Sequence, residues 1–349
     1  MDIGLGLDPS LRLSWEQQRQ LAQEAVGLGY TSLWTPSSIN GRDAFHICAQ
    51  WWGATAQATP GGVATGISVV PAPQWTATTL AATAGTVAEI TGGRFVLGIG
   101  TGSIYSADYR HTYGMAELPP LAVMKDYLTT LRGLLGGQTV DHQGPAVTLR
   151  GLRLTFRPPA VPVYLAALGP QMLRLAGAAA DGASLNWCSA EQVAWSRATI
   201  AQGAARVNRD PAAVHVQEYI RICVDDDEGV ARVSLAKSIL SYALARAGAS
   251  KEHGYRGHFA RMGFDAQLST LEARRDAGAS DDEIAEAFPT ELLRHVAYYG
   301  PAAGAASAFT RLAQGLDTAV VRVVAARPGT DSVRAAMQAC APALSPVSQ

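Results

Sequence analysis

Short apolar runs and amphipathic stretches alternate along most of the chain. The runs are rich in β-branched residues, whereas the stretches between them place apolar residues at helical spacing. Strands are predicted over 2–7, 31–35, 62–70, 94–100, 161–168, 182–187, 214–224 and 318–324. Eight strands alternating with helices favour a (β/α)₈ barrel over a doubly wound sheet, with parallel strands and right-handed crossovers.

The helices between these strands carry start and stop signals. Ser14 followed by Gln17 predicts a capping box at the first helix, and Gly29 suits its left-handed C-terminal cap. Further helices are predicted over 43–59, 78–90, 120–135, 170–180, 190–207 and 228–247 and from residue 331, with a small hairpin over 140–154.

Residues 248–300 break the alternation. This stretch is polar and contains the charged clusters "ARRDAG" and "SDDEIAEAF". We expect a mostly helical insertion between the seventh and eighth strands, on the side where barrel enzymes build lids. The chain 1–349 would then form a single domain, with 248–300 as its insertion or lid.

Composition excludes several classes of protein. Apolar residues make up 48% of the 349 residues and charged residues 16%, so the chain can bury a large core. A formal net charge of −1 without a basic run argues against binding of nucleic acid or an anionic membrane. No uninterrupted apolar segment reaches the ~18 residues of a membrane span. The N-terminus lacks signal-peptide features and the four cysteines form no CxxC pair, so a cytoplasmic protein with reduced thiols is expected.

Candidate chemistry lies just beyond each predicted strand, because barrel enzymes carry their sites on those loops. The loops are 36–38, 68–74, 100–103, 167–169, 186–187 and 325–329. They are rich in glycine, small residues and hydroxyls but poor in acids, bases and metal ligands, so no metal site is predicted. Backbone amides and small polar groups suit a large flat cofactor that brings its own reactivity.

The histidines give no alternative site. His46 falls on a predicted helix, where a satisfied structural role is expected. His253 and His258 fall in the polar insertion, where a solvated surface is expected. No GxSxG elbow supports a hydrolase.

The glycines in "RFVLGIGTGS" have two further interpretations. Gly98, Gly100 and Gly102 resemble a dinucleotide-binding turn, but the third glycine comes one residue early and no helix follows at once. They also suit a strand that must pack tightly against its neighbours.

Several segments together resemble the luciferase-like monooxygenase superfamily. They are "LGYTSLWTPSS", "TGISVVPAPQW", "EITGGRFVLGIGTGS", "VDHQGPAVTLRGLRL" and "VPVYLAALGPQMLRLAGAAADGASLNW". The resemblance runs from residue 2 to about 224 and resumes near 291. It is closer to the branch that uses coenzyme F420, a deazaflavin, than to the branch that uses flavin mononucleotide (FMN). It implies a barrel with an insertion, usually a homodimer, that transfers hydride between the deazaflavin and a small-molecule substrate.

The resemblance also implies roles for particular residues. Ser68 and Val69 would be joined by a non-prolyl cis peptide beneath the deazaflavin ring, and Thr101 and Gly102 would lie near that ring. Ala167, Leu168 and Gly169 would offer amides to the cofactor phosphate, at a helix N-terminus that favours anions. Pro36, Gly100 and Asn186 complete the implied cofactor-binding set.

The chain departs from its relatives where their acids and bases lie. Ser37 and Ser38 stand where many relatives have Asp–His, and Ser103 stands where a sugar-phosphate branch has Glu. These three serines are the candidate catalytic residues, and as weak acids and bases they suit orientation of a carbonyl or a proton relay to water. Five aromatic residues could form apolar walls of a substrate site: Trp34, Trp75, Tyr105, Tyr109 and Trp187. For Trp34, packing in the buried core is the alternative.

Three functions therefore stay open. The first is an F420-dependent oxidoreductase acting on an unidentified small organic molecule. The second is an FMN-dependent monooxygenase supplied with reduced flavin by a partner reductase. The third is a non-catalytic relative that binds a cofactor or another protein.

Overall fold

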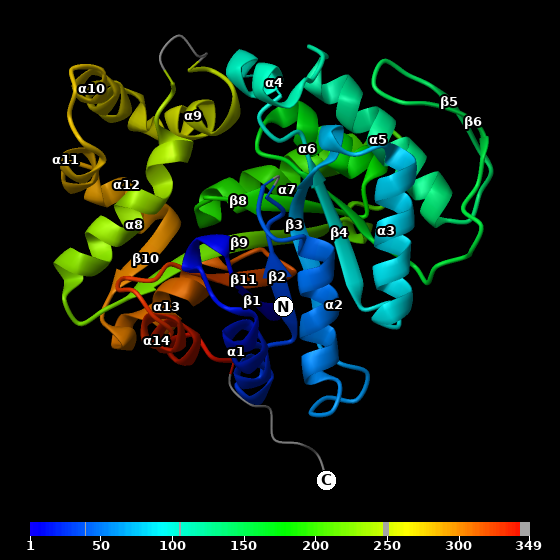
Figure 1. The fold of residues 1–349 in the computed structure, drawn as a ribbon. Coiled ribbons are helices and arrows are strands. Elements are labelled where there is room, and N and C mark those ends of the chain that lie inside the picture. The colour runs from blue at the N-terminus through cyan, green and yellow to red at the C-terminus, as the bar shows by residue number, and fades with distance from the viewer. Residues whose placement is uncertain (39, 105, 247–250, 343–349) are drawn as a thin grey trace.

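The computed structural model describes residues 1–38, 40–104, 106–246 and 251–342, and its centre is a closed parallel barrel (Figure 1). The barrel strands are β1 (Asp2–Gly6), β2 (Ser32–Thr35), β3 (Ala64–Pro71), β4 (Phe95–Gly100), β7 (Val163–Ala166), β8 (Gly182–Asn186), β9 (His215–Val224) and β11 (Thr318–Val323). Neighbours pair in that order, and β11 pairs with β1 to close the ring. The predicted (β/α)₈ barrel and all eight of its strands are confirmed.

Helices surround this barrel and bury their apolar faces against it (Figure 1). They are α1 (Trp15–Gly27), α2 (Ala44–Thr55), α3 (Ala77–Ile90), α5 (Pro120–Leu135), α6 (Pro170–Ala179), α7 (Ala190–Ala205), α13 (Ala302–Leu312) and α14 (Asp331–Ala339). The predicted capping box of α1 is present: Ser14 Oγ accepts from the Gln17 amide at 3.1 Å, and Gln17 Oε1 accepts from the Ser14 amide at 2.8 Å.

Aromatic side chains fill the barrel interior. Trp34, Tyr164 and Tyr219 form a buried cluster with Val320, all on inward-facing positions of their strands. A Cβ at Gly66 would lie 2.3 Å from the Trp34 ring, so glycine is required opposite this indole. Of the two roles predicted for Trp34, buried packing is therefore confirmed and the substrate wall is wrong.

The insertion begins earlier than predicted and has its own core. It comprises α8 (Glu228–Ala243), α9 (Gly254–Phe259), the π-helical turn η4 (Ala260–Phe264), α10 (Asp265–Asp276), α11 (Asp281–Glu286), α12 (Thr290–Val296) and β10 (Ala297–Gly300). Residues of α8 through β10 form a hydrophobic cluster separate from the main core, beside the barrel (Figure 1).

One expectation for this region is corrected and another is confirmed. Residues 297–300 form a strand rather than a helix, because β9 is long enough to pair with β11 through 217–222 and with β10 through 221–224. The seventh helix, predicted over 228–247, is present as α8, which contacts β9 and also packs in the insertion core, while α13 contacts β9 as well. The single-domain organisation and the lid role stay predictions.

Smaller elements complete the chain. The predicted hairpin is present as β5 (Val140–Gln143) and β6 (Thr148–Leu152). A short helix that was not predicted, α4 (Ala107–Tyr113), follows the glycine-rich loop, and three 3₁₀ turns are η1 (Pro9–Leu11), η2 (Ala72–Gln74) and η3 (Pro211–Ala213). The four cysteines are free and buried. In the described part of the chain, every helix is too short or too polar to cross a membrane.

Candidate active site

The residues predicted for the site gather at one edge of the barrel, which we call the mouth: the C-terminal ends of the barrel strands and the loops that follow them. Parallel strands bring these ends together. Most of the predicted residues there are half-buried: Pro36, Ser37, Ser38, Val69, Thr101, Gly102, Ser103, Leu168, Gly169 and Asn186. Three are buried: Ser68, Gly100 and Ala167. The mouth is therefore lined mostly by small residues that solvent reaches.

The bulge of β3 forms one wall of the mouth. The Ser68–Val69 peptide bond is cis, as the resemblance implied, and the register with β4 shifts between Ile67 and Val70. The Ser37 amide donates to the Val69 carbonyl at 3.3 Å. This contact joins the end of β2 to the bulge.

The glycine-rich loop is bare partly because it is tightly packed. A Cβ at Gly100 would lie 2.8 Å from Val69 Cγ2 and 3.1 Å from Ala166 Cβ. Gly102 has a φ of +59°, and a Cβ there would lie 3.0 Å from both Pro71 Cβ and the Tyr109 hydroxyl. At Gly98 a Cβ would lie 2.4 Å from the Ile67 carbonyl oxygen, so the interpretation that these glycines permit close packing is confirmed for all three positions.

The loop before α6 differs, because it leaves space. Gly169 is the N-cap of α6, no side chain caps this helix, and a Cβ at Gly169 would meet no atom within 4 Å. The Ala167 amide already donates to the Ser184 carbonyl at 3.2 Å. The Leu168 and Gly169 amides have no acceptor among the described residues. Exposed amides at a helix N-terminus attract anions.

The insertion places a cation beside that loop. Arg261 of η4 donates from Nη2 to the Leu168 carbonyl at 3.1 Å. Sequence reasoning missed this residue, because the polar composition of the insertion gave no sign of which side chains turn toward the barrel.

The three candidate catalytic serines lie at the mouth but form no catalytic pair among the described residues. Ser38 Oγ donates to Asn40 Oδ1 at 3.2 Å, and the Ser103 carbonyl accepts from the Ser106 amide at 2.8 Å. No described contact joins Ser103 to Ser37 or Ser38. Their roles stay predictions.

Two charged strand residues that sequence reasoning missed also reach the mouth. Arg322 of β11 is paired with Asp8, and its guanidinium lies 4.7 Å from the centre of the Tyr219 ring. Burial lowers the pKa of Arg322 to about 10. Arg221 of β9 is opposite Arg322 in the sheet register. An arginine near the C-terminal end of a predicted strand was the available signal for both.

Arg221 connects the mouth to the insertion. Its Nη1 donates to Asn186 Oδ1 and, at 3.2 Å, to the Tyr219 carbonyl. Its guanidinium lies 3.8 Å from the centre of the Trp187 ring. Asn186 Nδ2 in turn donates to the Tyr255 hydroxyl at 2.6 Å. The Asn186 side chain is therefore held in place from both sides.

The opposite face of β9 carries a second buried polar group. Glu218 Oε1 accepts from the Cys188 amide at 2.6 Å, and burial raises the pKa of Glu218 to about 8. His258 lies nearby: its Nε2 donates to the Trp187 carbonyl at 2.9 Å, and burial lowers its pKa to about 4. The expectation that His258 is solvated is therefore wrong, because α9 turns this face into the insertion core.

The other histidines and aromatic residues divide between surface, core and mouth. His253 is exposed, and His46 is exposed and bonded to Asp43, which caps α2. Trp187 is fully buried, so its predicted role as a wall is wrong. Trp75 is half-buried against the Phe45 ring. Tyr109 is half-buried beside Gly102 and bonded to Gln74, whereas Tyr105 lies outside the described residues.

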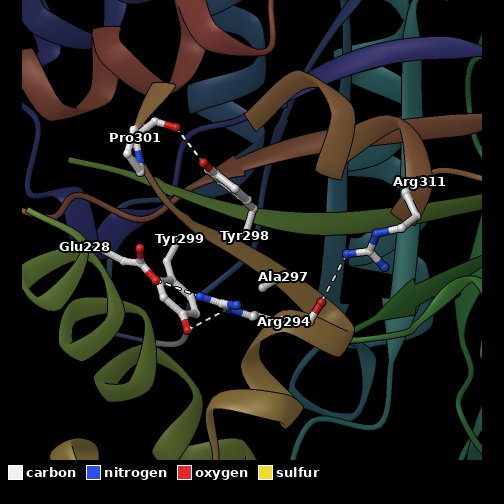
Figure 2. A pocket seen from close by; sticks show the side chains of 7 residues that line it. All are labelled: Glu228, Arg294, Ala297, Tyr298, Tyr299, Pro301 and Arg311. Atoms are coloured by element: carbon white, nitrogen blue, oxygen red, sulfur yellow. Dashed lines mark hydrogen bonds and ion pairs between the residues drawn. The ribbon is translucent and has the colours of Figure 1, made fainter. Parts of the chain in front are cut away.

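Two cavities lie outside the barrel interior. One, of about 460 Å³, adjoins the mouth through Gln74 and is mostly apolar; it is lined by Pro73, Gln74, Ile104, Tyr113, Gly114, Met115, Ala116, Leu118, Val123, Tyr127 and Ala146. The other, of about 310 Å³, lies between α8, α12, β10 and α13 (Figure 2). In this second cavity Arg294 is bonded to Glu228 at 2.7 Å and to the Tyr299 hydroxyl at 3.0 Å, so its charge is satisfied within the protein.

The fold and the mouth define a (β/α)₈ barrel whose strand ends present glycines, hydroxyls and helix amides. The family model described as luciferase-like monooxygenase matches residues 4–319. The chain belongs to this family.

Individual relatives share less than a third of their aligned residues with this chain. The chain is 28% identical over 238 residues to a 5,10-methylenetetrahydromethanopterin reductase of Methanolobus tindarius, covering 68% of this chain and 69% of the relative. The solved coenzyme F420-dependent tetrahydromethanopterin reductase of Methanopyrus kandleri superposes with a TM-score of 0.74 at 18% identity, covering 97% of this chain and 96% of that one.

A flavin-binding structure is also similar. The oxygenating constituent of 3,6-diketocamphane monooxygenase from Pseudomonas putida, solved with FMN, superposes with a TM-score of 0.64 at 15% identity and covers 98% of this chain and 97% of that one. At these identities the solved structures support the fold and leave the cofactor open.

Proposed function

We propose that the protein is an oxidoreductase that binds coenzyme F420 at the mouth and transfers a hydride between this deazaflavin and a small organic substrate. The observation that carries the proposal is the uncapped N-terminus of α6, with open space in front of Gly169 and Arg261 beside it. The names of the relatives support it, since the Methanopyrus kandleri reductase is described as F420-dependent.

The residues of the α6 loop fit a phosphate-bearing cofactor. A phosphate there would accept from the Leu168 and Gly169 amides and be attracted by the Arg261 guanidinium. The Ala167 amide cannot serve the phosphate in the same way, because it already donates to the Ser184 carbonyl. This refines the predicted phosphate set from three amides to two.

The other side of the mouth fits a flat ring. Val69 of the bulge and Thr101 and Gly102 of the next loop are half-buried, so a ring could lie against backbone and small side chains there. Bound coenzyme F420 supplies a ring carbon that accepts or donates a hydride. Ser37, Ser38 and Ser103 would orient the substrate oxygen by hydrogen bonds, and any proton would reach it through water, because a hydroxyl is a weak acid.

The apolar cavity beside Gln74 could hold the part of the substrate that does not react. Assembly as a homodimer and a cytoplasmic location belong to the same proposal and rest on the family resemblance and on the cysteine pattern.

Titration of the purified protein with coenzyme F420 and with FMN, followed by fluorescence, tests the cofactor assignment. F420 should bind more tightly than FMN. Tight binding of FMN without binding of F420, together with oxygen consumption when reduced flavin is added, would instead favour the monooxygenase. Binding of neither cofactor would favour the non-catalytic alternative.

The variant Gly169→Asp tests the phosphate loop. Aspartate is a strong N-cap, so its carboxylate should bond the α6 amides, keep or raise the thermal midpoint, and repel a phosphate. We expect F420 affinity to fall about tenfold or more. Gly53→Asp, which adds the same charge to the exposed side of α2, is the matched control and should bind F420 as the parent does. Unchanged affinity of Gly169→Asp would remove the phosphate role from this loop.

A further inference from the structure

Arg221 is a buried arginine whose charge has no carboxylate partner among the described residues. Only 2% of its surface is exposed. Both oxygens that accept from it, Asn186 Oδ1 and the Tyr219 carbonyl, are neutral. Its Nη2 is buried and has no hydrogen-bond partner in the described structure.

Other buried arginines of the chain are neutralised. Arg322, opposite Arg221 in the register, is paired with Asp8. Arg256 in the insertion donates to Glu272 Oε1 at 2.8 Å. Of the two arginines that are fully buried in the described part of the chain, Arg256 has a carboxylate partner and Arg221 has none.

Glu218 is near enough to attract Arg221 but forms no salt bridge with it. The two residues are three positions apart on β9 and so point to opposite faces of the strand. Glu218 is bonded to the Cys188 amide, and burial favours its protonated, uncharged form at neutral pH. The remaining groups against the guanidinium are the rings of Trp187 and Tyr242 and the neutral side chain of Asn186.

The position of Arg221 places it at the mouth. It shares its strand face with Gln217, which bonds to Ser68 inside the barrel at 3.4 Å, and with Tyr219 of the interior cluster. Tyr219 pairs with Asn186 at the end of β8, so Arg221 lies one step further toward the mouth. Asn186, its bonded neighbour, is half-buried and reached by solvent.

A buried guanidinium without a counter-charge costs stability, and an apolar side chain of similar length would fill the same space at lower cost. We propose that Arg221, with Asn186 beside it, binds an oxyanion of the substrate, a carboxylate or phosphate oxygen, at the mouth. This rests on the proposed function and names its substrate class: an anionic metabolite. The cofactor phosphate has its own place at α6, beside Arg261.

The test compares thermal midpoints of the full chain with and without small probes: inorganic phosphate, acetate, and acetamide as the neutral match for acetate. Phosphate and acetate should raise the midpoint of the parent more than acetamide does. Arg221→Met should lose part of this anion-specific rise, and the part that remains belongs to the α6 N-terminus beside Arg261. Arg311→Met, which removes an exposed arginine at the cavity of Figure 2, should keep the whole rise.

Stability separates a binding role from a structural one. If Arg221 is kept for a ligand, Arg221→Met should be at least as stable as the parent without added anion. Arg221→Lys keeps the charge but not the planar fork and should weaken the anion effect about tenfold. An equal anion effect in Arg221→Met, or none in the parent, would overturn the proposal, as would a clear loss of stability in Arg221→Met.

Repeating the measurements with coenzyme F420 bound identifies the source of the oxyanion. If the anion effect persists in the F420 complex, and Arg221→Met binds F420 within about twofold of the parent, the oxyanion belongs to the substrate. If F420 abolishes the difference in anion effect between the parent and Arg221→Met, Arg221 serves the cofactor and the substrate assignment fails. If the parent does not bind F420 at all, the proposed function fails, whereas the anion measurement still decides whether Arg221 is an anion site.

Discussion

The barrel and the insertion bury charge in different ways. In the insertion, Arg256 and Glu272 are each 3% exposed in their side chains and bond one another directly. Glu272 also accepts from the Ala245 amide at 2.8 Å, which ties α10 to the segment after α8. The barrel instead fills its interior with aromatic rings and keeps its arginines, Arg221 and Arg322, at the mouth.

This difference shows what each region is built to do. A buried ion pair with several hydrogen bonds fixes one arrangement of the insertion core. An arginine without a carboxylate stabilises nothing comparable, so its position at the mouth indicates a ligand. The insertion also contributes Tyr255 and Arg261 to the mouth, so the two regions share one site.

The largest effect is expected in the insertion. Glu272→Ala removes the buried counter-charge of Arg256 and leaves it only the exposed Asp265, which should reduce the free energy of unfolding by about 3–5 kcal/mol. Urea unfolding followed by circular dichroism measures this loss. The control is Glu228→Ala, which breaks an exposed pair with Arg294 and should cost less than about 1 kcal/mol. Equal losses in the two variants would contradict the difference between buried and exposed pairs.

The next largest effect is expected in the barrel interior. Gly66→Ala places a methyl group 2.3 Å from the Trp34 ring, inside contact distance, and should reduce the free energy of unfolding by about 1–3 kcal/mol. Combining it with Trp34→Leu should recover part of the loss, because the smaller side chain gives room. A double variant whose loss is the sum of the two single losses would show that the two sites do not conflict.

The barrel was predictable because each of its units repeats one pattern. The run 62–70 and the helix 120–135 follow the rules of buried strands and amphipathic helices, and both are present. The insertion has no such repeat, and its polar composition gave no sign of the core inside it. Strand β10 could not be distinguished from the helix before it, because it pairs with the C-terminal end of β9, which is distant in the sequence.

The parts of the site that are formed by local backbone could be predicted from the sequence. The parts that are formed by side chains from distant segments could not. The Ser68–Val69 bulge and the α6 N-terminus follow from local sequence and family resemblance. The roles of Arg221 and Arg261 could not be predicted, because they depend on the folded chain. Arg221 is buried without a counter-charge, and Arg261 contacts a loop that lies 93 residues away in the sequence. The wrong expectations for Trp34, Trp187 and His258 share this cause.

The smallest effect concerns pH and the boundary between the two regions. Burial raises the pKa of Glu218 from 4.5 to about 8, so its contribution to stability is full below pH 4.5 and is lost as pH rises through 8. Burial lowers the pKa of His258 from 6.5 to about 4, so its contribution is present above pH 6.5 and is lost as pH falls through 4. The two slopes oppose one another between pH 4.5 and 6.5, and only the Glu218 slope acts between pH 6.5 and 8.

Glu218→Gln tests this boundary. The amide oxygen can still accept from the Cys188 amide, but the side chain no longer titrates. The parent should lose about 2 kcal/mol of unfolding free energy between pH 6.5 and 8, and the variant should lose little of it. Urea unfolding at several pH values measures both slopes. If the parent has no slope in this window, Glu218 is ionised at neutral pH, which would make it a counter-charge near Arg221 and weaken the case for an anionic substrate.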